Sequence, residues 1–188
     1  MKFIKRSNLL LLALCLSMGS ATTATAGGTI EIGGKTAVTG NLSITTSKPD
    51  VFDVTTTIVY LGTSLTRTSA DARWEYGVGL TVGILNFDSD EPGGENGTIA
   101  TYTPTAQVRI NSDLMGPEEN FLVYVGAVGG VTIIDFEFYK DEIGAFGPKL
   151  GAEYYFSPRV AVQAENVFLV DTEKGINNNF GVGVKFLF

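Results

Sequence analysis

The chain of 188 residues contains no histidine, and its one cysteine is Cys15. A hydroxyl nucleophile activated by a histidine base therefore cannot be built from it, which excludes the usual serine hydrolase and acyltransferase sites. A Ser–Lys or paired-carboxylate device has no motif behind it. We predict no catalytic residues, no metal ligands and no cofactor, and we expect a protein that is not an enzyme.

Long apolar runs are also missing, apart from one near the N-terminus. A basic segment, residues 1–6, precedes the apolar residues 9–18, and small residues follow, with Ala24 and Ala26 in A-x-A positions. This order is typical of a secretory signal peptide, whose apolar part is too short for a permanent anchor, although a retained helix is the alternative. We predict cleavage between Ala26 and Gly27, giving a signal peptide of residues 1–26 and a mature domain of residues 27–188. Cys15 would be discarded with the peptide, which leaves no thiol.

Positive charge is scarce, with 13 Lys and Arg against 20 Asp and Glu, for a net charge of −7. The predicted signal peptide carries three of the cations and no acid, so the mature chain would have a net charge of −10. Nucleic-acid binding requires the opposite sign, and no nucleic-acid partner is expected. The length of the mature chain fits one domain.

Two-residue alternation is what the sequence has in abundance. At the C-terminus every even position is apolar, and the odd positions are mostly glycine or lysine: the apolar set is Phe180, Val182, Val184, Phe186 and Phe188. A period of two predicts a strand with one apolar face. Similar alternation recurs over residues 30–44, 73–84, 100–110, 149–156 and 160–168. Residues 54–66 and 121–134 have strand composition without clean alternation, so we predict two more strands there and leave their faces unassigned.

The connections between these eight strands alternate in character. Residues 47–53, 87–98, 135–144 and 171–178 form acidic or Gly- and Asn-rich segments that are fairly long. Of the intervening connections, residues 157–158 are very tight, and residues 68–72 and 112–120 are short to moderate. An even number of strands with long loops at one end and short turns at the other is typical of an outer-membrane β-barrel. The fold class we predict is all-β: a closed antiparallel transmembrane β-barrel of about eight strands, with up-and-down topology and both termini in the periplasm.

The distribution of side chains between the two faces favours lipid over water outside the barrel. One face carries most bulky apolar and aromatic residues, and the other holds glycine, threonine, glutamine and charges. Small and polar residues fit a narrow lumen, while the apolar set and aromatic residues near the strand ends fit a bilayer and its interfaces. A soluble lipocalin-like barrel, with its apolar face inside, is the alternative.

Two stretches carry a resemblance to a known family. Residues 150–165 (LGAEYYFSPRVAVQAE) are similar to the penultimate hairpin of small OmpA/OmpX-like outer-membrane barrels. Phe188, with Phe186 and Val184 at alternate positions, resembles the C-terminal signal read by the barrel-assembly machinery. The resemblance implies location in the cell outer membrane of a Gram-negative bacterium. It also implies outer-membrane lipid and lipopolysaccharide as surroundings, and the assembly machinery and periplasmic chaperones as partners during biogenesis. We expect a monomer.

Charged residues on the polar face predict a network inside the lumen. The nine residues are Glu31, Lys35, Arg73, Glu75, Arg109, Lys149, Glu153, Glu165 and Lys185. Five are basic and four acidic, so the set is close to balance, and buried charges must be paired. The network either fills the barrel or acts as a gate whose rearrangement opens a narrow pore. Glycines on the same face either leave room for water or ease strand curvature.

The long loops form a second candidate site. Asp88, Asp90, Glu91 and Glu95 make one of them strongly acidic, and such oxygens either are simply solvated or bind divalent cations that bridge lipopolysaccharide phosphates. Aromatic residues around position 140 indicate either strands that extend past the membrane, the simpler explanation, or a contact surface. Two functions stay open. One is a structural or surface-interaction role, and the alternative is a narrow channel for ions or small, even hydrophobic, solutes, as in OmpW-like barrels.

Overall fold

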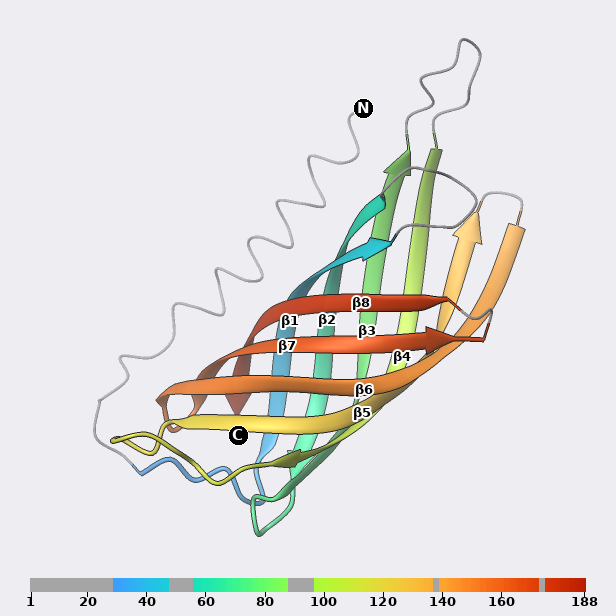
Figure 1. Ribbon diagram of the computed structural model, residues 1–188. Helices are drawn as coiled ribbons and strands as arrows, with labels where there is room; N and C mark the ends of the chain where they lie inside the picture. Colours follow the sequence, from blue (N-terminus) through green and yellow to red (C-terminus); the bar gives the residue numbers. More distant parts are fainter. Residues whose placement is uncertain (1–28, 48–55, 88–96, 137–138, 173–174) are drawn as a thin grey trace.

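A computed structural model describes residues 29–47, 56–87, 97–136, 139–172 and 175–188. They form eight β-strands (Figure 1). In chain order these are β1 (Thr36–Ser47), β2 (Thr56–Thr68), β3 (Trp74–Phe87), β4 (Gly97–Asn111), β5 (Phe121–Phe136), β6 (Tyr139–Ser157), β7 (Val160–Asp171) and β8 (Ile176–Leu187). Within the described residues, no helix has the length and apolar character needed to cross a membrane. The predicted signal peptide, its cleavage site at Ala26 and Gly27, and the acidic residues Asp88, Asp90, Glu91 and Glu95 lie outside the described residues.

The sheet closes on itself. Each strand pairs antiparallel with its neighbours in the chain, and β8 pairs with β1, from Ala37 opposite Leu187 to Thr45 opposite Asn179. In Figure 1, β7 and β8 cross the strands of the opposite wall, because strands in a closed barrel are tilted against its axis. Closure leaves no unpaired sheet edge. The predicted eight-stranded antiparallel barrel with up-and-down topology is confirmed.

The connections β2–β3, β4–β5 and β6–β7 lie at one end of the barrel, together with the C-terminus (Figure 1). We call this the turn end, and the opposite end the loop end. At the loop end, the prediction of a long loop over residues 135–144 is wrong, because β5 and β6 continue their pairing to Phe136 opposite Tyr139. Extended strands, the simpler of the two explanations considered for this region, are therefore the ones found.

Side chains alternate between the lumen and the outer surface along every strand. The outer surface is predominantly apolar, and its large exposed side chains include Leu61 on β2, Leu80 on β3, Val125 on β5 and Val182 on β8. Exposed aromatic residues lie near the turn end of their strands, among them Trp74, Tyr76, Tyr154 and Phe156. An apolar band with aromatic residues near its margin matches a bilayer and its interface.

The segment before β1 departs from the predicted strand over residues 30–44. The ladder begins only at Thr36, and the preceding residues turn at Gly34, which has a φ of 70° and donates its N–H to the Ser69 carbonyl at 2.9 Å. Glycine suits this turn because residues with a Cβ rarely adopt positive φ. Ile32 is buried as a consequence of the turn, against the turn end of the barrel.

Candidate functional site in the barrel lumen

Four charged side chains meet inside the lumen, in its half nearer the turn end. Arg109 Nη2 lies 2.8 Å from Glu75 Oε2 and 2.6 Å from Glu153 Oε1. Lys185 Nζ lies 2.7 Å from the same Glu75 oxygen and 3.1 Å from Glu153 Oε1. Positive and negative groups thus alternate around a closed circuit, which we call the ionic ring.

The ionic ring ties together four strands. Glu75 on β3 stands directly opposite Arg109 on β4 in the sheet register, whereas the contacts to Glu153 on β6 and Lys185 on β8 link strands that are not neighbours. All four side chains are buried, and Glu153 has no exposed surface. Two positive and two negative charges cancel. Such cancellation, with good geometry, is the condition under which a buried ionic group is tolerated.

Neighbouring hydroxyl groups complete the ring. The Tyr155 hydroxyl donates to Glu153 Oε2 at 2.6 Å, and the Thr68 hydroxyl donates to Glu75 Oε2 at 3.3 Å. A carboxylate that accepts several hydrogen bonds loses less on leaving water than one that accepts few. The ring is therefore a hydrogen-bonded network as well as a set of ion pairs.

A second charged pair lies beside the ring. Lys149 Nζ is 3.0 Å from Glu165 Oε2 and also donates to Gln107 Oε1, while the Tyr124 hydroxyl donates to Glu165 Oε2 at 3.0 Å. The Tyr124 ring connects the two groups, since the Arg109 guanidinium lies 4.0 Å from its centroid. This is a distance at which cation–π attraction is favourable.

The lumen is apolar at the turn end. Ile32, Ala37, Leu122, Ala161 and Leu187 form a buried cluster there, which we call the apolar plug. The side chains of Tyr124 and Tyr155 belong to the same cluster and direct their hydroxyls toward the charged groups. The plug and the ionic ring thus follow each other along the barrel.

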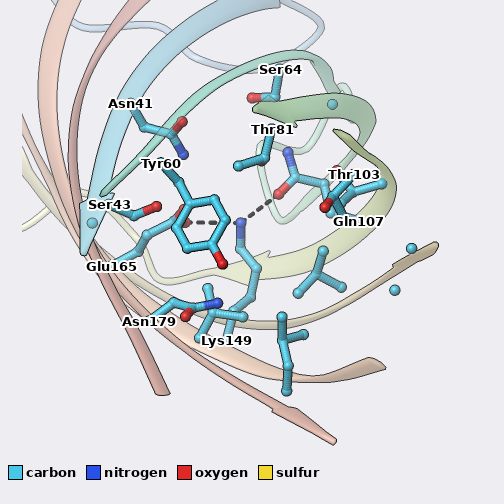
Figure 2. Close-up of a pocket in the computed structure, with 18 of the residues that line it drawn as sticks. Asn41, Ser43, Tyr60, Ser64, Thr81, Thr103, Gln107, Lys149, Glu165 and Asn179 are labelled. Carbon is cyan, nitrogen blue, oxygen red and sulfur yellow. Dashed lines mark hydrogen bonds and ion pairs between the residues drawn. The ribbon is translucent and has the colours of Figure 1, made fainter. Parts of the chain in front are cut away.

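On the loop-end side of the ring the lumen contains a cavity of about 250 Å³ (Figure 2). Glu75, Arg109, Lys149 and Glu165 contribute to its lining next to the ring, and the lining reaches Asp171 at the β7–β8 hairpin. Figure 2 shows Lys149 between Glu165 and Gln107, with hydroxyl and amide side chains from β1 to β4 around them. We call this cavity the lumen cup.

The nine residues predicted to form the lumen network divide into two groups. Glu75, Arg109, Lys149, Glu153, Glu165 and Lys185 come together inside the barrel. Glu31 and Arg73 do not join them and are exposed, and Lys35 is half-buried outside the strands. The reason is that the alternation in the sequence runs past the N-terminal ends of β1 and β3, so these three residues lie outside the strands. The C-terminal residues Phe180, Val182, Val184 and Phe188 are exposed on the outer side, and Phe186 is half-buried.

Several residues of this site were not predicted from the sequence. Tyr124 and Tyr155 are not among the nine residues of the predicted network, yet each points its hydroxyl at a buried carboxylate. Glycine provides the space for Tyr124, because a Cβ at Gly151, its partner in the β5–β6 register, would collide with the tyrosine ring and hydroxyl. The glycine lies on the polar face of its strand, between Lys149 and Glu153, and a tyrosine opposite such a glycine was the available indication that Tyr124 points into the lumen.

No protein-family model and no curated protein matches the sequence. Solved structures do match. Neisserial surface protein A superposes with a TM-score of 0.61 at 14% identity, over 81% of this chain and 97% of that one. The chain has the fold of a small outer-membrane β-barrel.

Two other small outer-membrane barrels agree with this assignment of the fold. The attachment invasion locus protein Ail of Yersinia pestis, solved with the heparin analogue sucrose octasulfate, gives a TM-score of 0.56 at 12% identity, over 83% of this chain and 99% of that one. Outer membrane protein H of Pseudomonas aeruginosa gives 0.51 at 13% identity, over 81% and 99%. The architecture and the apolar outer face together are those of an outer-membrane protein.

Proposed function

We propose that this protein is an integral outer-membrane barrel with a closed lumen and a structural or surface-interaction role. The observation that carries the proposal is that two groups of side chains obstruct the lumen one after the other. They are the ionic ring, in which all four charges are paired, and the apolar plug at the turn end. The interior of an eight-stranded barrel is narrow enough for side chains to fill it, so the ring and the plug of the described residues are expected to close the lumen on the turn-end side of the cup.

The surface role itself is assigned to the loop end. The acidic loop containing Asp88 and Glu91 lies outside the described residues, and its part in contacting lipopolysaccharide or another surface is a proposal from the sequence alone. Ail is named for attachment and invasion, but at 12% identity it shares the fold with this chain and supports no further transfer. The absence of histidine supports a role other than histidine-dependent catalysis. Biogenesis through periplasmic chaperones and the barrel-assembly machinery, a monomeric state and periplasmic termini are part of the same proposal.

The second candidate is a narrow channel, and the lumen cup is the observation that favours it. The cup already occupies part of the lumen, so a rearrangement of the ionic ring and the plug would be enough to connect its two ends. The two candidates therefore differ in one measurable property, which is whether the folded barrel conducts ions.

The test is planar-bilayer conductance of residues 27–188 refolded in detergent, with heat-modifiable gel mobility as the criterion for folding. A closed barrel gives a silent bilayer at protein amounts that insert a known porin. Reproducible discrete steps from the folded material would contradict the proposal and establish the narrow channel in its place.

A further inference from the structure

The aliphatic side chains in the lining of the lumen cup all lie on one side. Strands β1 to β4 supply hydroxyl and amide side chains, among them Asn41, Ser43, Ser64, Thr81 and Thr103. Every aliphatic side chain in the lining comes from the opposite strands β5 to β7: Val128, Ile143, Ala145, Val167 and Leu169. The same side also carries polar lining residues, namely Thr132, Lys149, Gln163, Glu165 and Asp171, whereas the β1 to β4 side has no aliphatic side chain in the lining. A cavity whose hydrocarbon lies on one side and whose opposite side offers only polar groups is complementary to an amphipathic molecule.

The charges beside the ionic ring are paired with one another, and Asp171 at the β7–β8 hairpin accepts hydrogen bonds from Gly175 N and the Asn177 amide. Lys149 contacts Glu165 and Gln107, and Arg109 and Glu75 are paired within the ionic ring. An ion entering the cup would lose its hydration without gaining an unpaired partner, which is costly. The electrostatics of the cup therefore favour an uncharged ligand.

Asn41 supplies a hydrogen-bonding position toward that ligand. Its Oδ1 atom is buried and has no hydrogen-bond partner among the described residues, and the side chain lines the cup. Buried acceptors normally accept a hydrogen bond, so this oxygen is expected to accept one from a donor outside the described residues. The oxygen lies against Gly62 on the neighbouring strand, so a hydroxyl or amide group of a molecule in the cup meets that need once the Asn41 side chain turns its amide toward the cup.

The size of the cup and the direction from which it can be reached further limit the ligands it can hold. At about 250 Å³ the cup is just smaller than typical small-molecule sites, whose volumes begin around 300 Å³, so its ligand must be small. Its lining extends to Asp171 and Asn177 at the β7–β8 hairpin, which places its approach at the loop end.

We propose that the lumen cup is a binding site for a small, uncharged amphipathic molecule that carries a hydroxyl or amide group on one side and a hydrocarbon surface on the other. The polar group faces β1 to β4, and the hydrocarbon faces Val128, Ile143 and Leu169. This site does not depend on conductance, since a closed barrel retains its cup. Failure of the binding test and failure of the closed-lumen proposal are thus separate results.

The experiment uses three probes of matched ring size: benzyl alcohol, toluene and benzoate. The barrel is placed in lipid nanodiscs with labelled Ile, Leu and Val methyl groups, and methyl shifts are followed by NMR. Benzyl alcohol is expected to shift the methyls of Ile143, Val167 and Leu169 in a saturable manner. Methyls of the outward-facing Leu61 and Leu80 report partition of the probe into lipid and correct for it.

Toluene lacks the hydroxyl and benzoate carries a charge, so each is expected to bind about tenfold or more weakly than benzyl alcohol. Ala145→Leu fills the cup and is expected to weaken benzyl alcohol binding about tenfold or more, whereas Ala127→Leu, on the outer surface of the adjacent strand, leaves it unchanged. Asn41→Ala, which removes atoms and cannot clash, is the second variant and is also expected to weaken binding.

Three results would overturn the proposal. The first is that no probe shifts the lumen methyls saturably, which means that the cup holds water alone. The second is that benzoate binds as well as benzyl alcohol, which contradicts the preference for uncharged ligands. The third is that Ala145→Leu and Asn41→Ala, both folded by gel mobility, bind benzyl alcohol as the wild type does.

Discussion

Glu153→Gln tests whether the ionic ring is a dry, closed network. Glu153 is fully buried and accepts from Arg109, Lys185 and Tyr155, with contacts between 2.6 and 3.2 Å. The amide keeps the shape of the carboxylate but removes its charge, so one positive charge is left uncompensated inside the barrel. Breaking a buried pair in this way costs about 3–5 kcal/mol. The free energy of unfolding, measured by urea titration in lipid vesicles, should fall by that amount.

A compensating variant sharpens the test. Lys185→Met removes the excess positive charge, so the Glu153→Gln/Lys185→Met pair should recover a large part of the loss, with a coupling energy of about 1–3 kcal/mol. Glu142→Gln, on the exposed loop-end part of the same strand, is the matched control and should change the free energy of unfolding by less than about 0.5 kcal/mol. If Glu153→Gln costs no more than Glu142→Gln, water screens the ring and the argument from buried charge fails.

Two further predictions concern packing and lipid exposure. Gly151→Ala places a Cβ against the Tyr124 ring and the Ala164 carbonyl and should lower the free energy of unfolding by about 1–3 kcal/mol. Gly40→Ala is the control, because its Cβ meets nothing within 4 Å, and it should cost far less. Equal losses for the two variants would contradict the packing argument. Leu80→Arg puts a charge on the outer surface and should lower the free energy of unfolding in vesicles by about 2–4 kcal/mol, with Leu80→Met as the size-matched control. If Leu80→Arg leaves the free energy of unfolding unchanged, this face does not contact the hydrocarbon of the bilayer.

The barrel was predictable from the sequence because alternation, loop lengths and the C-terminal strand all indicate the same fold. The faces of residues 54–66 and 121–134 were not, and the structure shows why. On β5 the inward residues Leu122, Tyr124 and Val128 are as apolar as the outward ones, so a period of two leaves no trace in hydropathy. On β2 the outward face carries Thr63 and Arg67, so its sequence does not stand out as apolar.

The charged site was predictable in part for a related reason. Residue type and alternation identify which charges share a face, and six of nine did meet in the lumen. They do not locate the strand ends, so Glu31 and Arg73 were included although both are exposed outside the ladder. Nor do they reveal that the aliphatic side chains of the lumen cup all lie on one side, since this depends on which strands stand opposite one another in the closed barrel.

The order of the layers along the lumen leads to a last prediction, which separates a gate from a filler. Arg109→Ala breaks two contacts of the ionic ring, but the apolar plug below it, with Leu122 and Leu187, stays in place. The single variant should therefore remain silent in planar bilayers while losing stability. Leu122→Gly alone should also remain silent, because the ring is intact.

Only the Arg109→Ala/Leu122→Gly pair removes both obstacles, and only that variant is expected to give discrete conductance steps, provided that its gel mobility shows a folded barrel. Steps from folded Arg109→Ala alone would mean that the ring by itself closes the lumen and that the plug is permeable. In that case the charged circuit is the gate, and the narrow-channel function becomes the better account of this barrel.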